Sequence, residues 1–317
     1  GCRRILPGRA RAAARRERER TLVMRTALDC VPCFIRQALD SVRFVSGNPE
    51  FHEHILKRVL VELSEIDYSV TPPEVGGRVH RLVRQLANSG DPYADIKRSF
   101  TERARAVLPE LRERVRASDD PFVAALRLAG AGNIIDLAPN GALRSEDVDA
   151  AIERAYGVPV DDRAVESLRT ACGRADSILY LADNAGELVF DRLLLEQLPA
   201  GRVQVAVKGG AVINDATRED AEQAGIADLA EIIDTGADTP GLVLAGASEE
   251  FRAVFEAADV VIAKGQGNYE ALSTAPREVF FLLIVKCDVV AEDIGTHTGT
   301  LYVGHRVPEE VSYAGWR

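Results

Sequence analysis

Long apolar runs and disulfide patterns are missing from this sequence. No window approaches about 18 consecutive apolar residues, the length that a membrane-spanning helix needs. The 317 residues include only five cysteines, and residues 1–23 hold no apolar run of signal-peptide length. An odd number of cysteines in this context favours a reducing compartment over a disulfide framework. We therefore expect a cytoplasmic protein with no membrane partner.

Acidic residues outnumber basic ones outside the start of the chain. The net charge is −10, and residues 1–23 contain eight Arg and two Glu, so the remainder carries a net charge of −16. Affinity for nucleic acid comes mainly from clustered Lys and Arg, and we expect no nucleic-acid partner. Nucleotide-binding signatures are missing too. There is no G-x-x-x-x-G-K-[ST] motif, and no G-x-G-x-x-G opens a helix after a strand.

The basic extension 1–23 precedes the only methionine, Met24. Three explanations are open: upstream sequence translated too early, an organellar targeting segment, or a basic interaction tail. The first is favoured because a recognisable pattern begins directly after Met24. We expect this extension to be disordered and to carry no chemistry.

The pattern of apolar residues changes near residue 130. Spacings of three and four predict helices over 34–45, 55–63, 75–86 and 96–115. Short apolar runs then follow at 133–137, 177–181, 203–207, 231–233, 260–263 and 279–285, with helical segments between the later ones. Such alternation predicts parallel βαβ units and an α/β sheet covered on both faces. We expect a helical domain over 24–130, an α/β domain over 131–304 and a tail over 305–317.

Polar segments follow three of the predicted strands. They are DNAGE at 183–187, KGG at 208–210 with NDAT at 214–217, and KGQGNYE at 264–270. In open α/β sheets, ligands bind beyond the carboxyl ends of the strands. Asp and Asn supply oxygen ligands for Mg²⁺ or Mn²⁺, and Lys and Gly suit a phosphate group. Each segment alone could be a helix cap or a turn. Together they indicate a metal-dependent phosphoester hydrolase.

In this order, the three segments resemble the signatures of the damage-control phosphatase family, long catalogued as domain of unknown function eighty-nine. CVPCF at 30–34 resembles the mark of its prokaryotic-type branch, and DPY at 91–93 with Lys97 and GNIID at 132–136 also match. The resemblance covers residues 24 to 303. It implies an N-terminal helical bundle packed on a Rossmann-like three-layer α/β/α domain.

The resemblance also implies roles for individual residues. One divalent metal (Mg, Mn, Co or Ni) would be held by Asp183, Asn184 and Asp215. The substrates would be small phosphorylated metabolites, either damaged or overflow sugar phosphates or cofactor precursors. Asn133 and Lys264 fall where family members contact the substrate phosphate or its scaffold. The further substrate-binding candidates are Asp136, Lys208, Gly265, Asn268 and Glu270.

Several mechanisms are open for this site. The metal could bridge a phosphate oxygen and orient a water, with Lys264, or more weakly Lys208, stabilising the developing charge. Asp183 or Asp215 could act as a general base while also ligating. A covalent aspartyl-phosphate route is a third possibility.

Two weaker signals remain. Three interpretations are open for Cys30 and Cys33: a helix start with half-buried thiols, a redox pair, or half of a zinc site. We favour the first. Lys286 and Asp288 follow the 279–285 run, where an ordinary ion pair is favoured over a place in the cleft.

Two other functions compete with the phosphatase hypothesis. One is a carboxylate O-methyltransferase, an activity associated with a eukaryotic branch of the same family. Rossmann-like methyltransferases usually have a Gly-rich loop after the first strand and an acidic residue ending the second. Here the first strand ends in Asp-Asn and the second ends in Lys208, so the pattern is poor. The other is a non-catalytic metabolite- or metal-binding protein.

Overall fold

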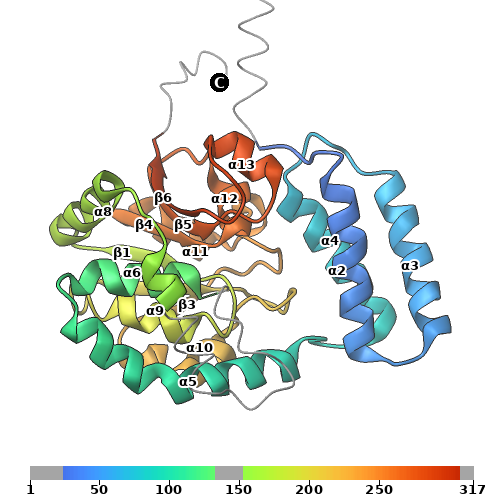
Figure 1. Ribbon diagram of the computed structural model, residues 1–317. Coiled ribbons are helices and arrows are strands. Elements are labelled where there is room, and N and C mark those ends of the chain that lie inside the picture. The colour runs from blue at the N-terminus through green and yellow to red at the C-terminus, as the bar shows by residue number, and fades with distance from the viewer. Residues whose placement is uncertain (1–23, 133–152, 308–317) are drawn as a thin grey trace, which may run out of the picture.

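The computed structural model describes residues 24–132 and 153–307 and shows a mixed α/β fold around a six-stranded sheet (Figure 1). The predicted strand 133–137, Asn133 and Asp136, the extension 1–23 and most of the tail lie outside these residues. The strand order is β3-β2-β1-β4-β5-β6. The strands are β1 (Ile178–Leu181), β2 (Val203–Val207), β3 (Glu231–Asp234), β4 (Val260–Lys264), β5 (Val279–Ile284) and β6 (Leu301–Arg306). Strands β1 to β5 pair in parallel and β6 is antiparallel to β5.

Alternate residues of the strands face two separate hydrophobic cores. Ile178 and Tyr180 of β1 belong to one core, whereas Leu179 and Leu181 belong to the other. Both sets are buried, because side chains alternate across a strand and helices cover both faces. This explains why β1 is a continuous apolar run in the sequence.

Helices from both halves of the chain cover the first face. They are α5 (Ala94–Ala117), α6 (Pro121–Ala131), α8 (Asp162–Arg174), α9 (Leu188–Leu195) and α10 (Arg218–Ala224). Leu108 and Leu111 of α5 and Leu126 of α6 share a core with Phe190 of α9 and Tyr180 of β1. The division of the chain at residue 130 stays a prediction. The packing nevertheless attaches α5 and α6 to the sheet rather than to the preceding helices.

The opposite face carries α11 (Glu249–Ala257), α12 (Gln266–Leu272) and α13 (Asp288–Ile294). Phe251 and Phe255 of α11 and Tyr269 of α12 pack against the strands there. The sheet is therefore sandwiched between helices, as the alternating pattern predicted. The last strand, β6, was not predicted, because its only apolar alternation is the short Leu301 to Val303 stretch.

Helices α2 (Cys30–Val45), α3 (Pro49–Ser64) and α4 (Pro72–Ala87) form a group beside the sheet with a core of their own (Figure 1). Helix α4 approaches the loop after β3 closely, because Gly77 has no side chain. A Cβ at Gly77 would lie 2.6 Å from Cγ2 of Thr239. Arg81 and Arg84 of α4 also pair with the two carboxylate oxygens of Asp238, at 2.5 and 2.6 Å. These contacts hold α4 against the loop that follows β3.

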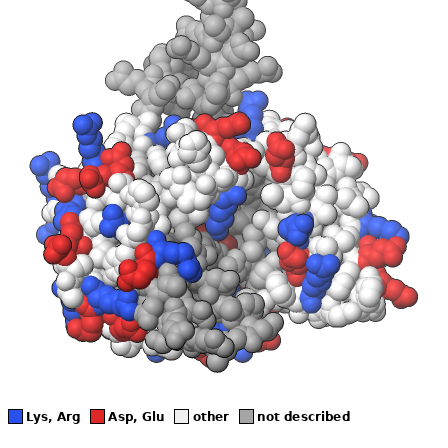
Figure 2. Space-filling view, in the orientation of Figure 1, with Lys and Arg blue, Asp and Glu red and all other residues white. Residues whose placement is uncertain are grey.

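One face of the molecule carries charged side chains of both signs. On the face seen in Figure 2, Lys and Arg side chains alternate with Asp and Glu side chains. Within the described residues, none of the helices is both long and apolar enough to cross a membrane.

Candidate active site

The candidate site lies where β1 and β4 end side by side. Strand β1 lies between β2 and β4. From β1 the chain builds the sheet towards one edge through β2 and β3, and then towards the other edge through β4, β5 and β6. This is a topological switch point, where open α/β sheets bind their ligands. The polar segments after β1, β2 and β4 meet here.

Asp183, Asn184 and Asp215 are brought together by the backbone. Asn184 and Asp215 form an isolated antiparallel bridge. The Ala216 N–H donates to the Asp183 carbonyl oxygen at 2.8 Å, and the Ala185 N–H donates to the Asn214 carbonyl oxygen at 2.9 Å. The three predicted metal ligands thus come from adjacent, hydrogen-bonded segments, and each residue is at most 8% exposed.

The loop that carries Asp215 is held by a helix cap as well. Thr217 and Asp220 form a capping box at the start of α10, so the cap interpretation of NDAT also holds. Buried Lys97 of α5 pairs with Asp220 at 2.7 Å and with Asp91 at 2.7 Å. Ile213, just before the loop, has a φ of 45°, an unfavourable value for a β-branched residue. Backbone strain of this kind is often found at functional sites.

Burial perturbs the carboxyl groups of the site. Burial, then the nearby Glu187 and Asp215 carboxylates, raise the pKa of Asp183 from 3.8 to about 8. Burial also raises the pKa of Asp215, although Lys208 opposes this. Oδ2 of Asp215 is buried, and the cation that it contacts among the described residues is Nζ of Lys208, at 3.4 Å. Two buried carboxylates and an amide suit a hard divalent cation, which would neutralise this charge.

Gly265 lets the end of β4 lie directly against Asp183. Its φ is +81°, and a Cβ built on it would lie 1.9 Å from Oδ2 of Asp183. Any side chain at this position would occupy the space of the carboxylate. Gly265 therefore shapes the site through its backbone.

Lys264 is buried beneath the site and forms ion pairs with two carboxylates. Its Nζ lies 2.9 Å from Oδ1 of Asp191 and 3.5 Å from Oε2 of Glu187, and the residue is 1% exposed. Burial disfavours its charge, but Asp191 and Glu187 outweigh this and raise the pKa of Lys264. Lys264 does not line the cavity described below. Its catalytic role stays a prediction.

We expect Lys264→Met to lower the free energy of unfolding of the protein, and not only to change its activity. The substitution would leave Glu187 and Asp191 buried without their cation, a loss of about 3–5 kcal/mol for a broken buried pair. Urea unfolding followed by circular dichroism measures this, with Lys57→Met on the exposed face of α3 as the matched control. Wild-type stability in Lys264→Met would show that Lys264 is not needed to hold the two carboxylates.

The other predicted phosphate-binding residues have structural partners. Nζ of Lys208 lies 3.4 Å from Oδ2 of Asp215, and Lys208 is 4% exposed. Nδ2 of Asn268 donates to the carbonyl oxygens of Lys264 and Ala182, at 2.7 and 3.2 Å, which ties the end of β4 to the end of β1. Neither residue lines the cavity. Their substrate-binding role stays a prediction.

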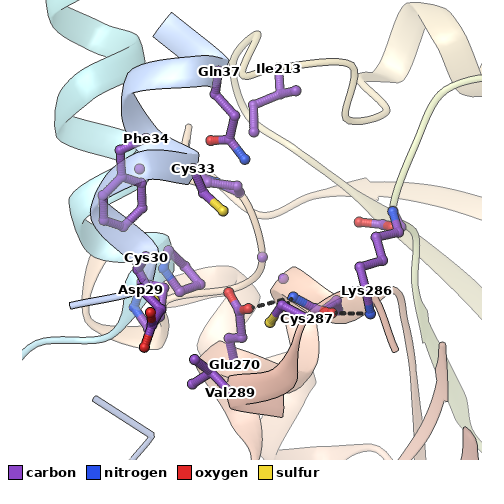
Figure 3. A pocket seen from close by; sticks show the side chains of 18 of the residues that line it. Asp29, Cys30, Cys33, Phe34, Gln37, Ile213, Glu270, Lys286, Cys287 and Val289 are labelled. Carbon is purple, nitrogen blue, oxygen red and sulfur yellow. Dashed lines mark hydrogen bonds between the residues drawn. The ribbon is translucent and has the colours of Figure 1, made fainter. Parts of the chain in front are cut away.

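A cavity of about 830 Å³ opens between the sheet edge and the helical group. Figure 3 shows residues of α2, among them Cys30, Cys33 and Gln37, on one side of it. Glu270, Cys287 and Lys286 lie across from them. Asp183, Asn184 and Asp215 also line this cavity. The volume fits a small metabolite.

Of the predicted substrate-binding residues that the structure describes, Glu270 alone lines the cavity. Its Oε1 accepts a hydrogen bond from Nε2 of Gln266 at 2.8 Å. Burial raises the pKa of Glu270 to about 7, against the opposing effects of Gln266 and Lys286. A carboxyl group of this kind can donate or accept a hydrogen bond near neutral pH.

The Cys30 and Cys33 thiols line the same cavity, together with Cys287. All three are free cysteines. Burial raises the pKa of Cys30 to about 11, which disfavours a reactive thiolate. Over the described ranges, no three His, Cys, Asp or Glu side chains are arranged to hold a metal. Cys30 is half-buried, as predicted, whereas Cys33 is exposed. These observations favour the structural interpretation of the pair.

Sequence reasoning gave no role to Glu187 and Asp191, and for Lys286 it ranked a place in the cleft below an ion pair. Glu187 and Asp191 lie one helical turn apart at the start of α9, and both form ion pairs with Lys264. The signal was Asp191, which with Arg192 interrupts the otherwise apolar stretch of α9. Lys286 lines the cavity, and within the described parts of the chain no ion pair joins it to Asp288, contrary to the ion pair we favoured.

The fold and site together define a mixed α/β protein with a buried, acidic, oxygen-rich site at its strand ends. Residues 26–301 match the family model described as Damage-control phosphatase ARMT1-like domain, and the chain belongs to this family. The resemblance found in the sequence is thereby confirmed.

Relatives and a solved structure match along most of the chain. A protein named damage-control phosphatase from Archaeoglobus fulgidus is 32% identical over 86% of this chain and 96% of its own length. Another protein named damage-control phosphatase, from Pyrococcus horikoshii, is 31% identical over 88% of this chain and 97% of its own. The crystal structure of a DUF89 family protein from P. horikoshii has a TM-score of 0.82 at 31% identity. That match covers 89% of this chain and 99% of the other.

Proposed function

We propose that this protein is a metal-dependent phosphatase that hydrolyses small phosphorylated metabolites. The observation that carries the proposal is the cluster of Asp183, Asn184 and Asp215, buried and backbone-linked on the wall of a metabolite-sized cavity. Membership in the damage-control phosphatase family supports it, as do the names of two relatives. Damaged or overflow sugar phosphates and cofactor precursors are the proposed substrate classes.

Asp183, Asn184 and Asp215 would hold one divalent cation, either Mg, Mn, Co or Ni. When bound, such a cation supplies charge for a phosphate oxygen and lowers the pKa of a bound water. The carboxylates and the amide oxygen are the donor atoms, and Lys208 stays paired with Asp215. No Lys or Arg of the described residues lies within 4.0 Å of the Asp183 carboxylate. This favours Asp183 over Asp215 as the proton acceptor for the attacking water.

The walls of the cavity would exclude bulk water and orient the substrate. Phe34, Pro72 and Pro240 supply apolar surface, and Gln37 and Glu270 supply hydrogen-bonding groups. A phosphorylated metabolite with hydroxyl groups suits this mixture, because it needs both kinds of contact.

The test is a phosphate-release assay on the purified full chain after chelation. p-Nitrophenyl phosphate and a panel of sugar phosphates would be assayed with and without Mg²⁺, Mn²⁺, Co²⁺ or Ni²⁺. We expect release only after a metal is added back, and no methyl transfer from S-adenosylmethionine to carboxylates. Release that is equally fast in the chelated protein, or no release from any ester with any metal, would overturn the proposal.

Metal binding is expected to release protons near neutral pH. Because the folded-state pKa of Asp183 is raised, its neutral form is favoured in the metal-free protein below about pH 8. A metal needs the carboxylate, so binding displaces the proton, and affinity rises with pH until about pH 8. Because the pKa of Asp183 is raised on folding, the folded state binds this proton more tightly than the unfolded state does. The metal-free protein therefore loses stability as the pH rises from about 4 towards 8.

Calorimetry of Mn²⁺ binding in two buffers of different ionisation enthalpy, at about pH 7 and about pH 9, counts these protons. We expect fewer protons released at the higher pH. The same proton count at both values would show that Asp183 is already ionised at the lower pH.

A further inference from the structure

We propose that Gln37 selects substrates that carry hydroxyl groups, and that the buried His80 positions the Gln37 amide for this contact. The inference rests on the proposed function and deepens it, because it names the residues that would recognise the metabolite part of the substrate rather than its phosphate. Gln37 lies on α2 and lines the cavity, and His80 lies on α4.

One face of α2 is turned towards the cavity. Cys30, Cys33, Phe34 and Gln37 line the cavity, and they are three or four residues apart, as residues on one helical face are. Gln37 is half-buried, and Figure 3 shows its amide turned into the cavity, across from Lys286. The substrate phosphate would lie at the proposed metal ligands on the sheet edge. A side chain on the opposite wall is therefore placed to meet the metabolite part.

The contact with His80 fixes the direction of the Gln37 amide. Nε2 of His80 lies 3.4 Å from Oε1 of Gln37, at the long end of the range for such bonds. Because a carbonyl oxygen only accepts, Nε2 of His80 is the donor. The Nε2 group of Gln37 keeps both of its N–H bonds for the cavity, since it has no hydrogen-bond partner among the described residues.

His80 is suited to act as a fixed, neutral donor. It is 2% exposed. Burial, and then Arg84, lower the pKa of His80 to about 4, so at neutral pH its ring is neutral and carries one N–H. Burying that N–H is costly unless it has an acceptor, and within the described residues Gln37 is the acceptor.

Helix α4 holds the ring of His80 in place from both sides. Gly76, one turn before His80, would place a Cβ 3.0 Å from Cγ of Pro240, so the helix lies close to the loop after β3. Arg84, one turn after His80, pairs with Asp238 of the same loop at 2.6 Å. The position of the Gln37 amide is therefore tied, through His80, to the sheet edge.

Acceptor groups outnumber donor groups on the described part of the cavity wall. Gln266 already uses its N–H₂ group on Glu270 and Cys287. A hydroxyl group both donates and accepts, so it can donate to a carboxylate of the wall while it accepts from Gln37. A substrate without hydroxyl groups makes neither contact. The carboxyl groups among the described residues that line the cavity are those of Asp29, Asp183, Asp215, Glu270, Asp288 and Glu292.

The experiment compares Gln37→Met, which keeps the length of the side chain but removes its N–H₂ group, with Gln85→Met. Gln85 is exposed on α4 and does not line the cavity, so this control makes the same exchange elsewhere. Phosphate release in saturating Mn²⁺ is measured with glucose 6-phosphate, ribose 5-phosphate and glycerol 3-phosphate, and with phenyl phosphate, which has no hydroxyl group outside its phosphate. Thermal melting confirms that each variant folds.

We expect Gln37→Met to lose about tenfold in kcat/KM with the hydroxylated esters, because one neutral hydrogen bond is removed, and at most about threefold with phenyl phosphate. Gln85→Met should match wild type with every ester. Equal losses with both kinds of ester would show that Gln37 only shapes the cavity, and no loss with either would show that it makes no contact. Either result overturns the inference.

Two exchanges of His80 test its positioning role. His80→Gln carries an N–H near the place of Nε2, whereas the side chain of His80→Asn is too short to reach Gln37. We expect His80→Asn to lose selectivity for hydroxylated esters over phenyl phosphate, and His80→Gln to keep most of it. His54→Asn, on the exposed side of α3, is the control. If the two His80 variants have the same selectivity, His80 does not act through its N–H.

The failure of the proposed function is distinguishable from the failure of this inference. If wild type hydrolyses no ester, calorimetry measures the binding of the three hydroxylated esters and of inorganic phosphate to the Mn²⁺-loaded protein. Ester binding that weakens about tenfold in Gln37→Met, with a smaller effect on inorganic phosphate, would sustain the inference without the phosphatase activity. A wild type that cleaves phenyl phosphate but none of the hydroxylated esters is a phosphatase and refutes the inference. A wild type that neither cleaves nor binds these esters refutes both.

Discussion

Asp183→Asn is expected to lower metal-dependent phosphate release by about 10³-fold or more, without destabilising the protein. The variant loses one of two carboxylates that would hold the cation, and it also loses the favoured proton acceptor. Its shape is kept, because Asn184 can still donate from Nδ2 to an oxygen at this position, as it does now at 3.2 Å. A phosphate-release assay over a range of Mn²⁺ concentrations measures the loss.

The stability of this variant separates function from folding. The raised pKa of Asp183 means that the ionised carboxylate is disfavoured in the metal-free fold. A neutral amide removes this penalty, so metal-free Asp183→Asn should melt no lower than metal-free wild type at neutral pH. Asp176→Asn, an exposed carboxylate before the start of β1, is the control and should retain full activity. Full activity in Asp183→Asn would contradict the assigned site.

Gly265→Ala is expected to unfold the protein at markedly lower denaturant and to abolish metal binding. Its backbone has φ 81° and ψ 161°, a conformation that is costly for any residue with a Cβ, by about 1–3 kcal/mol. The new methyl group would also lie 1.9 Å from Oδ2 of Asp183, so either the strand end or the carboxylate must move. We expect a loss above about 3 kcal/mol in the free energy of unfolding, measured by urea titration.

Gly295→Ala is the matched control for this change. Gly295 ends α13 with a similar φ of +82°, but nothing lies within 4 Å of an added Cβ. This variant should lose only about 1 kcal/mol from the backbone term and keep its activity. If both variants lost the same amount, the contact between Gly265 and Asp183 would not matter for stability.

The sequence alone predicted the sheet edge at which the polar segments of the candidate site meet. Strands such as β1 and β4 are continuous apolar runs, and a parallel sheet brings their carboxyl ends to one edge. This argument needs no side-chain detail, and for that reason it placed Asp183, Asn184 and Asp215 together. The family resemblance, also drawn from these segments, was confirmed by the family match.

The roles of the lysines could not be predicted in the same way. Lys208 follows β2 and Lys264 ends β4, at the same sheet edge as Asp183. Successive side chains of a strand point to opposite faces of the sheet, so a place at this edge does not fix which way a lysine points. Whether a side chain reaches the cavity or the core below depends on tertiary partners such as Asp191, seventy-three positions away from Lys264. For Lys286 the sequence left the cleft as the less favoured alternative to an ion pair, and the structure shows that the residue lines the cavity.

The helical half of the chain shows a second limit of sequence reasoning. Periodicity predicted the helices but said nothing of which core each would join. Helices α2 to α4 share one core, whereas α5 and α6 pack on the sheet. The choice depends on surface complementarity, such as the close contact of Gly77 with Thr239, which a single sequence does not encode in a simple period.

The most direct test of the account is the position of a bound metal. Crystals grown with Mn²⁺ and measured for anomalous scattering would locate the ion without any assay. We predict one peak within about 2.0–2.3 Å of an oxygen of each of Asp183, Asn184 and Asp215. A peak held by Cys30, Cys33 and Cys287 instead, or no peak near Asp183 in Mn²⁺-saturated crystals, would contradict the proposed metal centre.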